Sequence, residues 1–181
     1  MLFTPTRAYL SILDVTPEIL REMGVSALIL DIDNTMTTHD NPKPIDGLFD
    51  WLDDMRRNNI KMMIVSNNHV PRVTPFAELL RIDFVPEGAK PLTKGYKQAA
   101  EKLGVPKKQI LTIGDQLFTD ILGAKLFGIR SILVKPIEPE KTRFFKFKRA
   151  MEKPFLPKKY AGDHLPMIDG KAILQGDNHG H

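Results

Sequence analysis

Short apolar runs recur along the chain, and they limit what it can fold into more than any other feature. Each is three or four residues long and is followed by polar residues, as expected for a strand that is buried on both faces of a sheet. The runs cover 27–30, 62–65, 110–113 and 132–134, and a weaker one lies at 83–85. Because helical patterns alternate with these strands, we predict an α/β protein. Right-handed crossovers then give a doubly wound, three-layer α/β/α sandwich with a mostly parallel sheet.

The helices between these runs have recognisable boundaries. Thr16, Pro17 and Glu18 provide an N-cap, a proline at the first position and an early acid. Gly104 and Pro106 are typical of the end of a helix. Further helices are predicted at 46–58, 75–81 (starting at Pro75), 92–103 and 118–127.

Length and composition exclude several classes of protein. A chain of 181 residues is most simply a single domain. Cysteine is absent, which rules out disulfides and thiolate metal sites. No apolar run approaches the length needed to cross a bilayer, and the first residues lack the apolar core of a signal peptide. We therefore expect a cytoplasmic protein.

Charge is distributed unevenly along the chain. Residues 135–159 carry nine basic and three acidic side chains, which is a net charge of +6, whereas the total is +4. We predict a catalytic core over 1–135, a basic and aromatic segment over 136–160, and a flexible polar tail over 161–181. The segment either packs on the core or contacts a membrane.

The segment from Arg143 to Arg149 interleaves three phenylalanines with four cations. At least one phenylalanine is expected to pack on the core as part of a C-terminal helix. The functional alternative is a peripheral contact with an anionic membrane through 143–160, on the inner face. Nucleic acid would attract the same composition, but it ranks below lipid because no nucleic-acid-binding module is recognisable.

Polar residues follow the predicted strands, at the edge of the sheet where doubly wound proteins place their sites. These residues are Asp31, Asp33, Ser66, Asn67, Asp115 and Asp120, and Lys90 precedes the helix predicted at 92–103. Two carboxylates at neighbouring strand ends repel each other unless a cation lies between them. Oxygen ligands without thiolates favour Mg²⁺. A carboxylate such as Asp31 can form an aspartyl-phosphate, and Asp33 can transfer the proton.

This pattern resembles the haloacid dehalogenase (HAD) superfamily, whose four motifs occur in order. They are D-x-D-x-T (Asp31, Asp33, Thr35), a serine at a strand end (Ser66), a lysine (Lys90) and G-D-x-x-x-x-D (Gly114, Asp115, Asp120). The resemblance implies that Asp31 attacks phosphorus, and that Asp31, the backbone carbonyl of Asp33 and Asp115 hold Mg²⁺, supported by Asp120. Thr35 and Ser66 would position phosphate. Lys90 can donate to phosphate oxygens as well, and Asn67 either contacts phosphate or satisfies backbone groups of its loop. An acid/base at Asp33 is typical of the phosphatases of this superfamily.

The spacing of the motifs narrows the resemblance. From Asp31 to Ser66 is 35 positions and from Ser66 to Lys90 is 24, so neither gap holds a large cap domain. The chain therefore resembles the capless subclass IIIA. It looks like the YqeG group within it, from the Thr16-Pro17-Glu18 start, the Ser66-Asn67-Asn68 triplet and the Lys135-Pro136-Ile137 tail. That group is similar to phosphatidylglycerophosphate phosphatases.

The leading interpretation is a Mg²⁺-dependent phosphomonoester hydrolase with an open site, acting on a phospholipid head group such as that of phosphatidylglycerophosphate. The alternatives are a soluble phosphatase of small metabolites or nucleotides, and a non-enzymatic phospho-acceptor or scaffold. A homo-oligomer could cover the open site. Gln116 departs from capless relatives that have a second Asp there, and His39 and His69 are interpreted as exposed loop residues.

Overall fold

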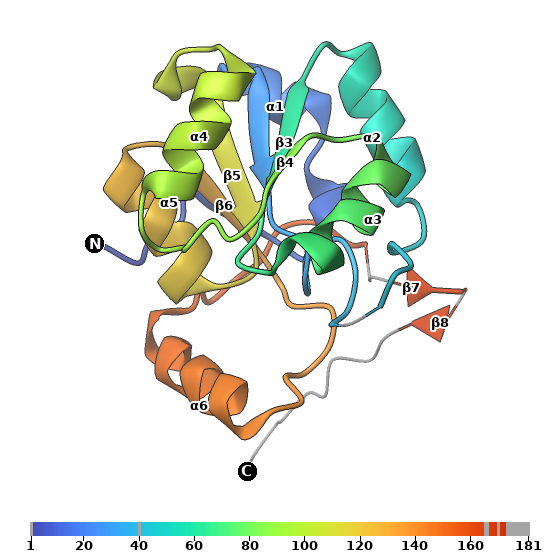
Figure 1. Cartoon of the computed structure of the whole chain (residues 1–181). Coiled ribbons are helices and arrows are strands. Elements are labelled where there is room, and N and C mark those ends of the chain that lie inside the picture. Colours follow the sequence, from blue (N-terminus) through green and yellow to red (C-terminus); the bar gives the residue numbers. More distant parts are fainter. Residues whose placement is uncertain (1, 40, 165–166, 170, 173–181) are drawn as a thin grey trace.

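The apolar runs form a six-stranded parallel sheet in the order β1-β6-β5-β2-β3-β4 (Figure 1). The computed structural model describes residues 2–39, 41–164, 167–169 and 171–172. The strands are β1 (Arg7–Tyr9), β2 (Ala27–Leu30), β3 (Lys61–Val65), β4 (Phe84–Val85), β5 (Ile110–Gly114) and β6 (Arg130–Val134). This sheet and the helices that cover it confirm the predicted α/β fold.

Helices cover both faces of the sheet because side chains of a strand alternate between the two faces. In β2, Leu28 and Leu30 join one apolar core, and Ala27 and Ile29 join the other. The first core includes side chains of α1 (Pro17–Glu22), α2 (Leu48–Arg57) and α3 (Val70–Leu80). The second includes side chains of α4 (Lys94–Leu103) and α5 (Leu122–Phe127).

Three elements differ from the prediction. Strand β1 was not predicted, because it has three residues and only Tyr9 is fully buried. Helix α3 begins at Val70 and not at Pro75, which lies inside it. Pro71 is the proline at the start of this helix, where a missing N–H costs nothing. The last helix of the core is preceded by a single π-helical turn over Leu117–Ile121.

The chain after β6 crosses the carboxyl edge of the sheet and forms α6 (Arg143–Glu152), which lies beneath that edge in Figure 1. Further on, the backbone of Ala161 bonds to Ala8 and Leu10 beside β1, and Met167–Ile168 (β7) pairs with Lys171–Ala172 (β8). Residues 165–166, 170 and 173–181 lie outside the described part, so flexibility of the tail stays a prediction. Among the described helices, none combines the length and apolar character needed to cross a membrane.

Candidate active site

Three acidic side chains meet at the carboxyl edge of the sheet. Asp31 follows β2 and Asp115 follows β5, and these strands are parallel neighbours in register. Asp120 comes from the π-helical turn, and it reaches the cluster because Gly114 has no side chain: a Cβ there would overlap the Asp120 carboxylate. Each of the three acids offers an oxygen within 4.8 Å of the others.

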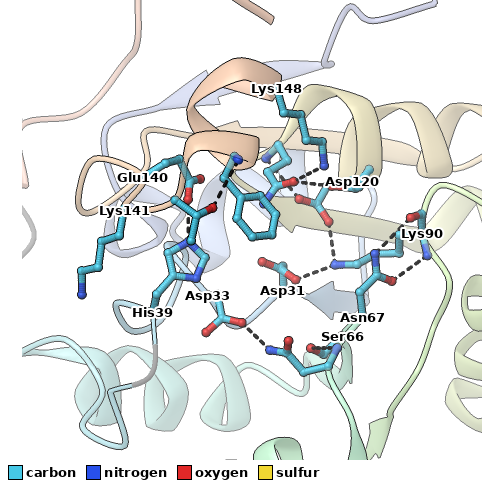
Figure 2. A pocket seen from close by; sticks show the side chains of 15 residues that line it. Asp31, Asp33, His39, Ser66, Asn67, Lys90, Asp120, Glu140, Lys141 and Lys148 are labelled. Carbon is cyan, nitrogen blue, oxygen red and sulfur yellow. Dashed lines mark hydrogen bonds and ion pairs between the residues drawn. The ribbon is translucent and has the colours of Figure 1, made fainter. Parts of the chain in front are cut away.

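Lys90 places its ammonium group between two of these acids. Its Nζ lies 2.5 Å from Oδ1 of Asp31 and 2.7 Å from Oδ1 of Asp120 (Figure 2). Asn67 fixes the backbone of this lysine, since its Oδ1 accepts the Lys90 N–H at 2.7 Å and its Nδ2 donates to the Lys90 carbonyl at 3.0 Å. Asn67 therefore positions Lys90. Its expected contact with phosphate stays a prediction.

Burial makes negative charge unfavourable in this cluster. It raises the pKa of Asp31 to about 8, although the neighbouring Lys90 acts in the opposite direction. Burial likewise raises the pKa of Asp115 to about 7, against the effect of Arg149. For Lys90, burial lowers the pKa, but the carboxylates of Asp120 and Asp31 outweigh it and raise the value. One lysine thus neutralises the cluster only in part, and a further cation would stabilise it.

The donor set fits a hard divalent cation. Oδ1 of Asp115 is buried and has no hydrogen-bond partner among the described residues, whereas its Oδ2 accepts from Arg149. A buried, unpaired carboxylate oxygen beside two other acids is costly unless a ligand completes it. All the available ligand atoms are oxygens, which Mg²⁺ prefers. Asp31, Asp115 and Asp120 are therefore the side chains that could hold the metal.

Asp33 lines the same cavity but is held by partners that the sequence did not reveal. Its Oδ1 lies 2.9 Å from Nη2 of Arg72 in α3, and its Oδ2 accepts from Nδ2 of Asn68. These two donors fix the carboxylate of Asp33, which Figure 2 shows at the cavity wall. A positioned carboxylate of this kind can transfer a proton to or from a bound group.

The two predicted phosphate-binding hydroxyls are placed differently. Ser66 lines the cavity, and its Oγ accepts the Asn68 N–H at 3.1 Å, which leaves its own O–H free to donate. Thr35 is buried outside the set of cavity-lining residues, and its Oγ1 has no partner in the described part of the chain. A direct contact between Thr35 and phosphate stays a prediction.

The C-terminal segment forms one wall of the cavity, so the site is less open than expected. The cavity has a volume of about 380 Å³, and residues of 140–148 line it together with the strand ends (Figure 2). These wall residues are Glu140, Lys141, Thr142, Phe145 and Lys148. Phe145 stacks near His39, with ring centroids 6.0 Å apart, as expected for at least one phenylalanine of the segment.

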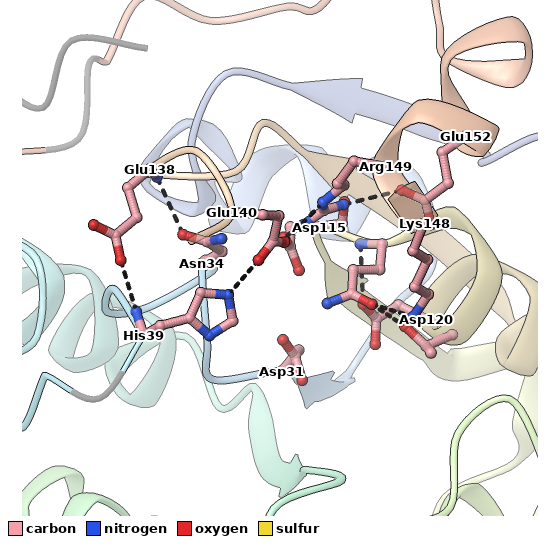
Figure 3. Close-up of polar contacts among 12 residues, drawn as sticks. Asp31, Asn34, His39, Asp115, Asp120, Glu138, Glu140, Lys148, Arg149 and Glu152 are labelled. Atoms are coloured by element: carbon pink, nitrogen blue, oxygen red, sulfur yellow. Dashed lines mark hydrogen bonds and ion pairs between the residues drawn. The ribbon is translucent and has the colours of Figure 1, made fainter. Parts of the chain in front are cut away.

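Arg149 connects α6 to the acidic cluster (Figure 3). Its guanidinium pairs with Oδ2 of Asp115 and donates at 2.7 Å to the carbonyl oxygen of the same residue. It also bonds to Glu140 at 2.9 Å and to Glu152 at 3.1 Å. Glu152 in turn accepts the backbone N–H of Phe118 at 3.0 Å. Arg149 therefore occupies one oxygen of Asp115 and leaves the other facing the cluster.

Sequence reasoning missed Arg149 because it treated the cations of the segment alike. Arg149 and Glu152 lie one helical turn apart, and this spacing is the signal that could have indicated a shared inward face. The interpretation of His39 was also wrong. Its Nε2 lies 2.8 Å from Oε2 of Glu140, and that hydrogen bond raises the pKa of the imidazole. His69 is exposed, as expected, and pairs with Glu87.

The cluster that follows β2 and β5 lies within the region that a known family shares. The sequence model described as "haloacid dehalogenase-like hydrolase" matches residues 7–128. The chain belongs to this hydrolase family. The matched region contains Asp31, Ser66, Lys90 and Asp115, and it ends before the segment that contributes Arg149.

One curated relative and two solved structures are similar to the chain. The chain is 36% identical over 154 residues to the "Probable phosphatase YqeG" of Bacillus subtilis (strain 168), covering 85% of this chain and 90% of that protein. The fold is similar to that of a 4-nitrophenylphosphatase from Thermotoga maritima, with a TM-score of 0.55, 15% identity, and coverage of 68% of this chain and 90% of the other. A haloacid dehalogenase-like hydrolase from Brucella suis 1330 has a TM-score of 0.52, 12% identity, and coverage of 60% and 84%.

Proposed function

We propose that this hydrolase is a Mg²⁺-dependent phosphomonoesterase in which Asp31 is the covalent nucleophile. The observation that carries the proposal is the cluster of Asp31, Asp115 and Asp120, in which Lys90 bonds to two of the acids and a buried oxygen of Asp115 is unpaired among the described residues. Such a site combines a nucleophile, a cation site and a fixed ammonium group. The relative from Bacillus subtilis, which bears the name of a phosphatase, supports the same reaction class.

The residues suggest a two-step reaction. In the first step an oxygen of Asp31 bonds to phosphorus while the bond to the leaving oxygen breaks, and Asp33 in its acid form gives that oxygen a proton. In the second step Asp33 takes a proton from water, whose oxygen attacks phosphorus and releases Asp31. Lys90 offsets charge on the transferring group throughout. When bound, Mg²⁺ supplies further positive charge, and Asp31, Asp115 and the Asp33 carbonyl would hold it with support from Asp120.

The test is phosphate release from a panel that contains an aryl phosphate, nucleotides, sugar phosphates and dispersed phosphatidylglycerophosphate. Release is expected with Mg²⁺ and is expected to stop with a chelator. No release from any substrate by a folded, Mg²⁺-bound protein would contradict the proposal.

Mg²⁺ should also stabilise the fold. A ligand that binds only the folded state at 100 times its Kd adds about 2.7 kcal/mol to the free energy of unfolding. We therefore expect the unfolding temperature to rise with Mg²⁺ concentration, measured by calorimetry after dialysis against chelator. Asp115→Asn should remove most of this rise, because Asp115 supplies the unpaired oxygen. An equal rise in Asp115→Asn would place the bound metal elsewhere.

The outer face of α6 favours a lipid substrate as the more specific function. Phe144, Phe147 and Met151 lie there, with 72%, 65% and 51% of their surface exposed. The two acids nearest to them in the segment, Glu140 and Glu152, are buried. The same segment carries six exposed cations: Lys141, Arg143, Lys146, Lys153, Lys158 and Lys159. A helix that exposes rings and cations and buries its acids suits an anionic lipid surface, where a phospholipid head group could reach the cavity.

Replacing Phe144 and Phe147 by Ser should weaken binding to anionic vesicles by about tenfold or more, because each ring loses apolar burial in the interface. Cosedimentation with phosphatidylglycerol vesicles measures this. The matched control is Leu126→Ser, since Leu126 is 54% exposed on α5, away from the segment. Unchanged binding by the double variant, or equal binding to uncharged vesicles, would favour the soluble-metabolite alternative.

A further inference from the structure

The cavity has room for more than the group that is transferred. Its volume of about 380 Å³ lies within the range of pockets that hold whole small molecules, roughly 300–1,000 Å³. The catalytic residues contribute only part of the lining. Five further lining residues come from the C-terminal segment, and this wall faces whatever carries the phosphate.

Most charged groups that line the cavity have an oppositely charged partner. Asp31 and Asp120 share Lys90, Asp33 pairs with Arg72, and Glu140 pairs with Arg149 and His39. Lys141 pairs with Glu138 at 3.1 Å.

Lys148 is the exception among the described cavity-lining residues. Its Nζ bonds at 2.5 Å to Oε1 of Gln116, which is uncharged, and no ion pair with a carboxylate occurs within 4.0 Å. The side chain is half-buried, and this burial lowers the pKa of its ammonium group. The carboxylates of Glu152 and Asp120 attract this ammonium group only from beyond ion-pair distance. A partly desolvated cation whose hydrogen-bond partner is neutral is unfavourable without a closer anion. A bound anion would give Lys148 the ion-pair partner that it lacks among the described residues.

The anion that Lys148 meets is not the transferring phosphate. Lys90 contacts the carboxylate of Asp31, to which the transferring phosphoryl group would bond. Lys90 is therefore the lysine that faces that group. Lys148 approaches from α6, on the side of Gln116, and has no bond to Asp31 or to Lys90. Phe145 is the aromatic residue on that wall, and the acceptors of Glu140 are taken by His39 and Arg149. The wall thus offers a donor to the leaving group without a free carboxylate to repel it.

We propose that Lys148 is a specificity-determining residue, which binds a second anionic group on the leaving-group side of the substrate. The inference rests on the proposed phosphatase function. It names the substrate class as phosphomonoesters whose leaving group carries a phosphodiester or a second phosphate. An uncharged alcohol as leaving group would leave the ammonium group of Lys148 unpaired.

Three soluble substrates with related leaving groups test this inference. Glycerol 3-phosphate has an uncharged leaving group, glycerol 1,3-bisphosphate adds a phosphate, and glycerophosphoglycerophosphate adds the phosphodiester of a lipid head group. A charge-assisted hydrogen bond contributes enough to change affinity by about 10- to 100-fold. Lys148→Met should lower kcat/KM for the two doubly anionic substrates by that factor, mainly through KM, and should change glycerol 3-phosphate by less than about threefold.

Two further variants separate charge from structure. Lys148→Arg should restore part of the affinity, because it keeps the cation. Lys97→Met removes an exposed lysine of α4, which does not line the cavity, and should behave as the wild type. A preference for the phosphodiester over the bisphosphate would point to a lipid head group, and the reverse to a free metabolite. An equal loss for all three substrates with Lys148→Met, or no loss, would overturn the inference.

Binding can be measured without turnover. Calorimetric titration of Asp31→Asn with glycerol 1,3-bisphosphate should give a Kd that Lys148→Met in the same background raises by about 10- to 100-fold. If no substrate is hydrolysed by the wild type but this difference holds, the proposed reaction fails and the anion site stands. If hydrolysis occurs and the difference is absent, the anion site fails and the reaction stands.

Discussion

Asp31→Asn abolishes phosphate release, with an expected loss in kcat of at least about 10⁴-fold, the order seen when a covalent nucleophile is removed. The amide that replaces the carboxylate cannot form the proposed aspartyl-phosphate, and it also removes one proposed ligand of the cation. Steady-state kinetics with an aryl phosphate at saturating Mg²⁺ measures the loss. Asp50→Asn, which changes an exposed acid of α2 in the same way, should keep full activity.

The loss should not come from unfolding. Burial raises the pKa of Asp31 to about 8 from an ordinary value of 3.8, so its ionisation lowers stability as the pH rises through that interval. The neutral amide removes this cost. We expect Asp31→Asn to unfold in chelator at pH 8.5 at a temperature no lower than the wild type. A folded variant that retains more than a few per cent of kcat would show that another group attacks phosphorus.

Arg149→Met should lower the free energy of unfolding by roughly 3–5 kcal/mol, the usual cost of removing one partner from a buried ion pair. The side chains of Asp115, Glu140 and Glu152 are at most 4% exposed, and all three pair with this guanidinium. Urea denaturation at pH 7.5 in chelator measures the change. The matched control is Arg143→Met, since Arg143 is an exposed arginine of the same helix.

Lowering the pH and removing a second charge both test whether unpaired carboxylates cause this destabilisation. Carboxylates left unpaired in a buried site acquire raised pKa values, so the deficit of Arg149→Met should shrink at pH 5, where they can take up protons. Adding Glu152→Gln to the variant should recover part of the lost stability. Arg149→Met that unfolds within about 0.5 kcal/mol of the wild type would mean that α6 is not anchored through this residue.

Much of the fold follows from the sequence because the central strands are buried on both faces. All four residues of β2 are buried, and so are all five of β5, which leaves continuous apolar runs that only a covered sheet explains. Strand β1 lacks this signal because it lies at an edge of the sheet and buries one side chain fully. Helix α3 contains two prolines near its start, and the pattern alone did not identify which of them begins it.

The meeting of Asp31, Asp115, Asp120 and Lys90 follows from topology, because parallel neighbouring strands end at the same edge. The contributions of Arg72 and Arg149 do not follow from it. Whether an arginine on a helix faces solvent or a buried carboxylate depends on how that helix packs, and composition is the same in both cases. In α6 the cations divide between the two faces, so the net charge of the segment did not reveal the inward ones.

Because the chain is synthesised from its N-terminus, the position of Arg149 determines how long Asp115 lacks its ion-pair partner during translation. Asp115 is synthesised 34 residues before Arg149. At translation rates of about 5–20 residues per second, the ribosome adds the arginine about 2–7 seconds after its partner. During that interval the nascent chain contains Asp31 and Asp115, but it has neither the arginine that pairs with Asp115 nor the cavity wall from α6. A polypeptide released by premature termination in this interval should therefore be left with an uncompensated acidic cluster, and quality-control proteases should remove it faster than the finished enzyme.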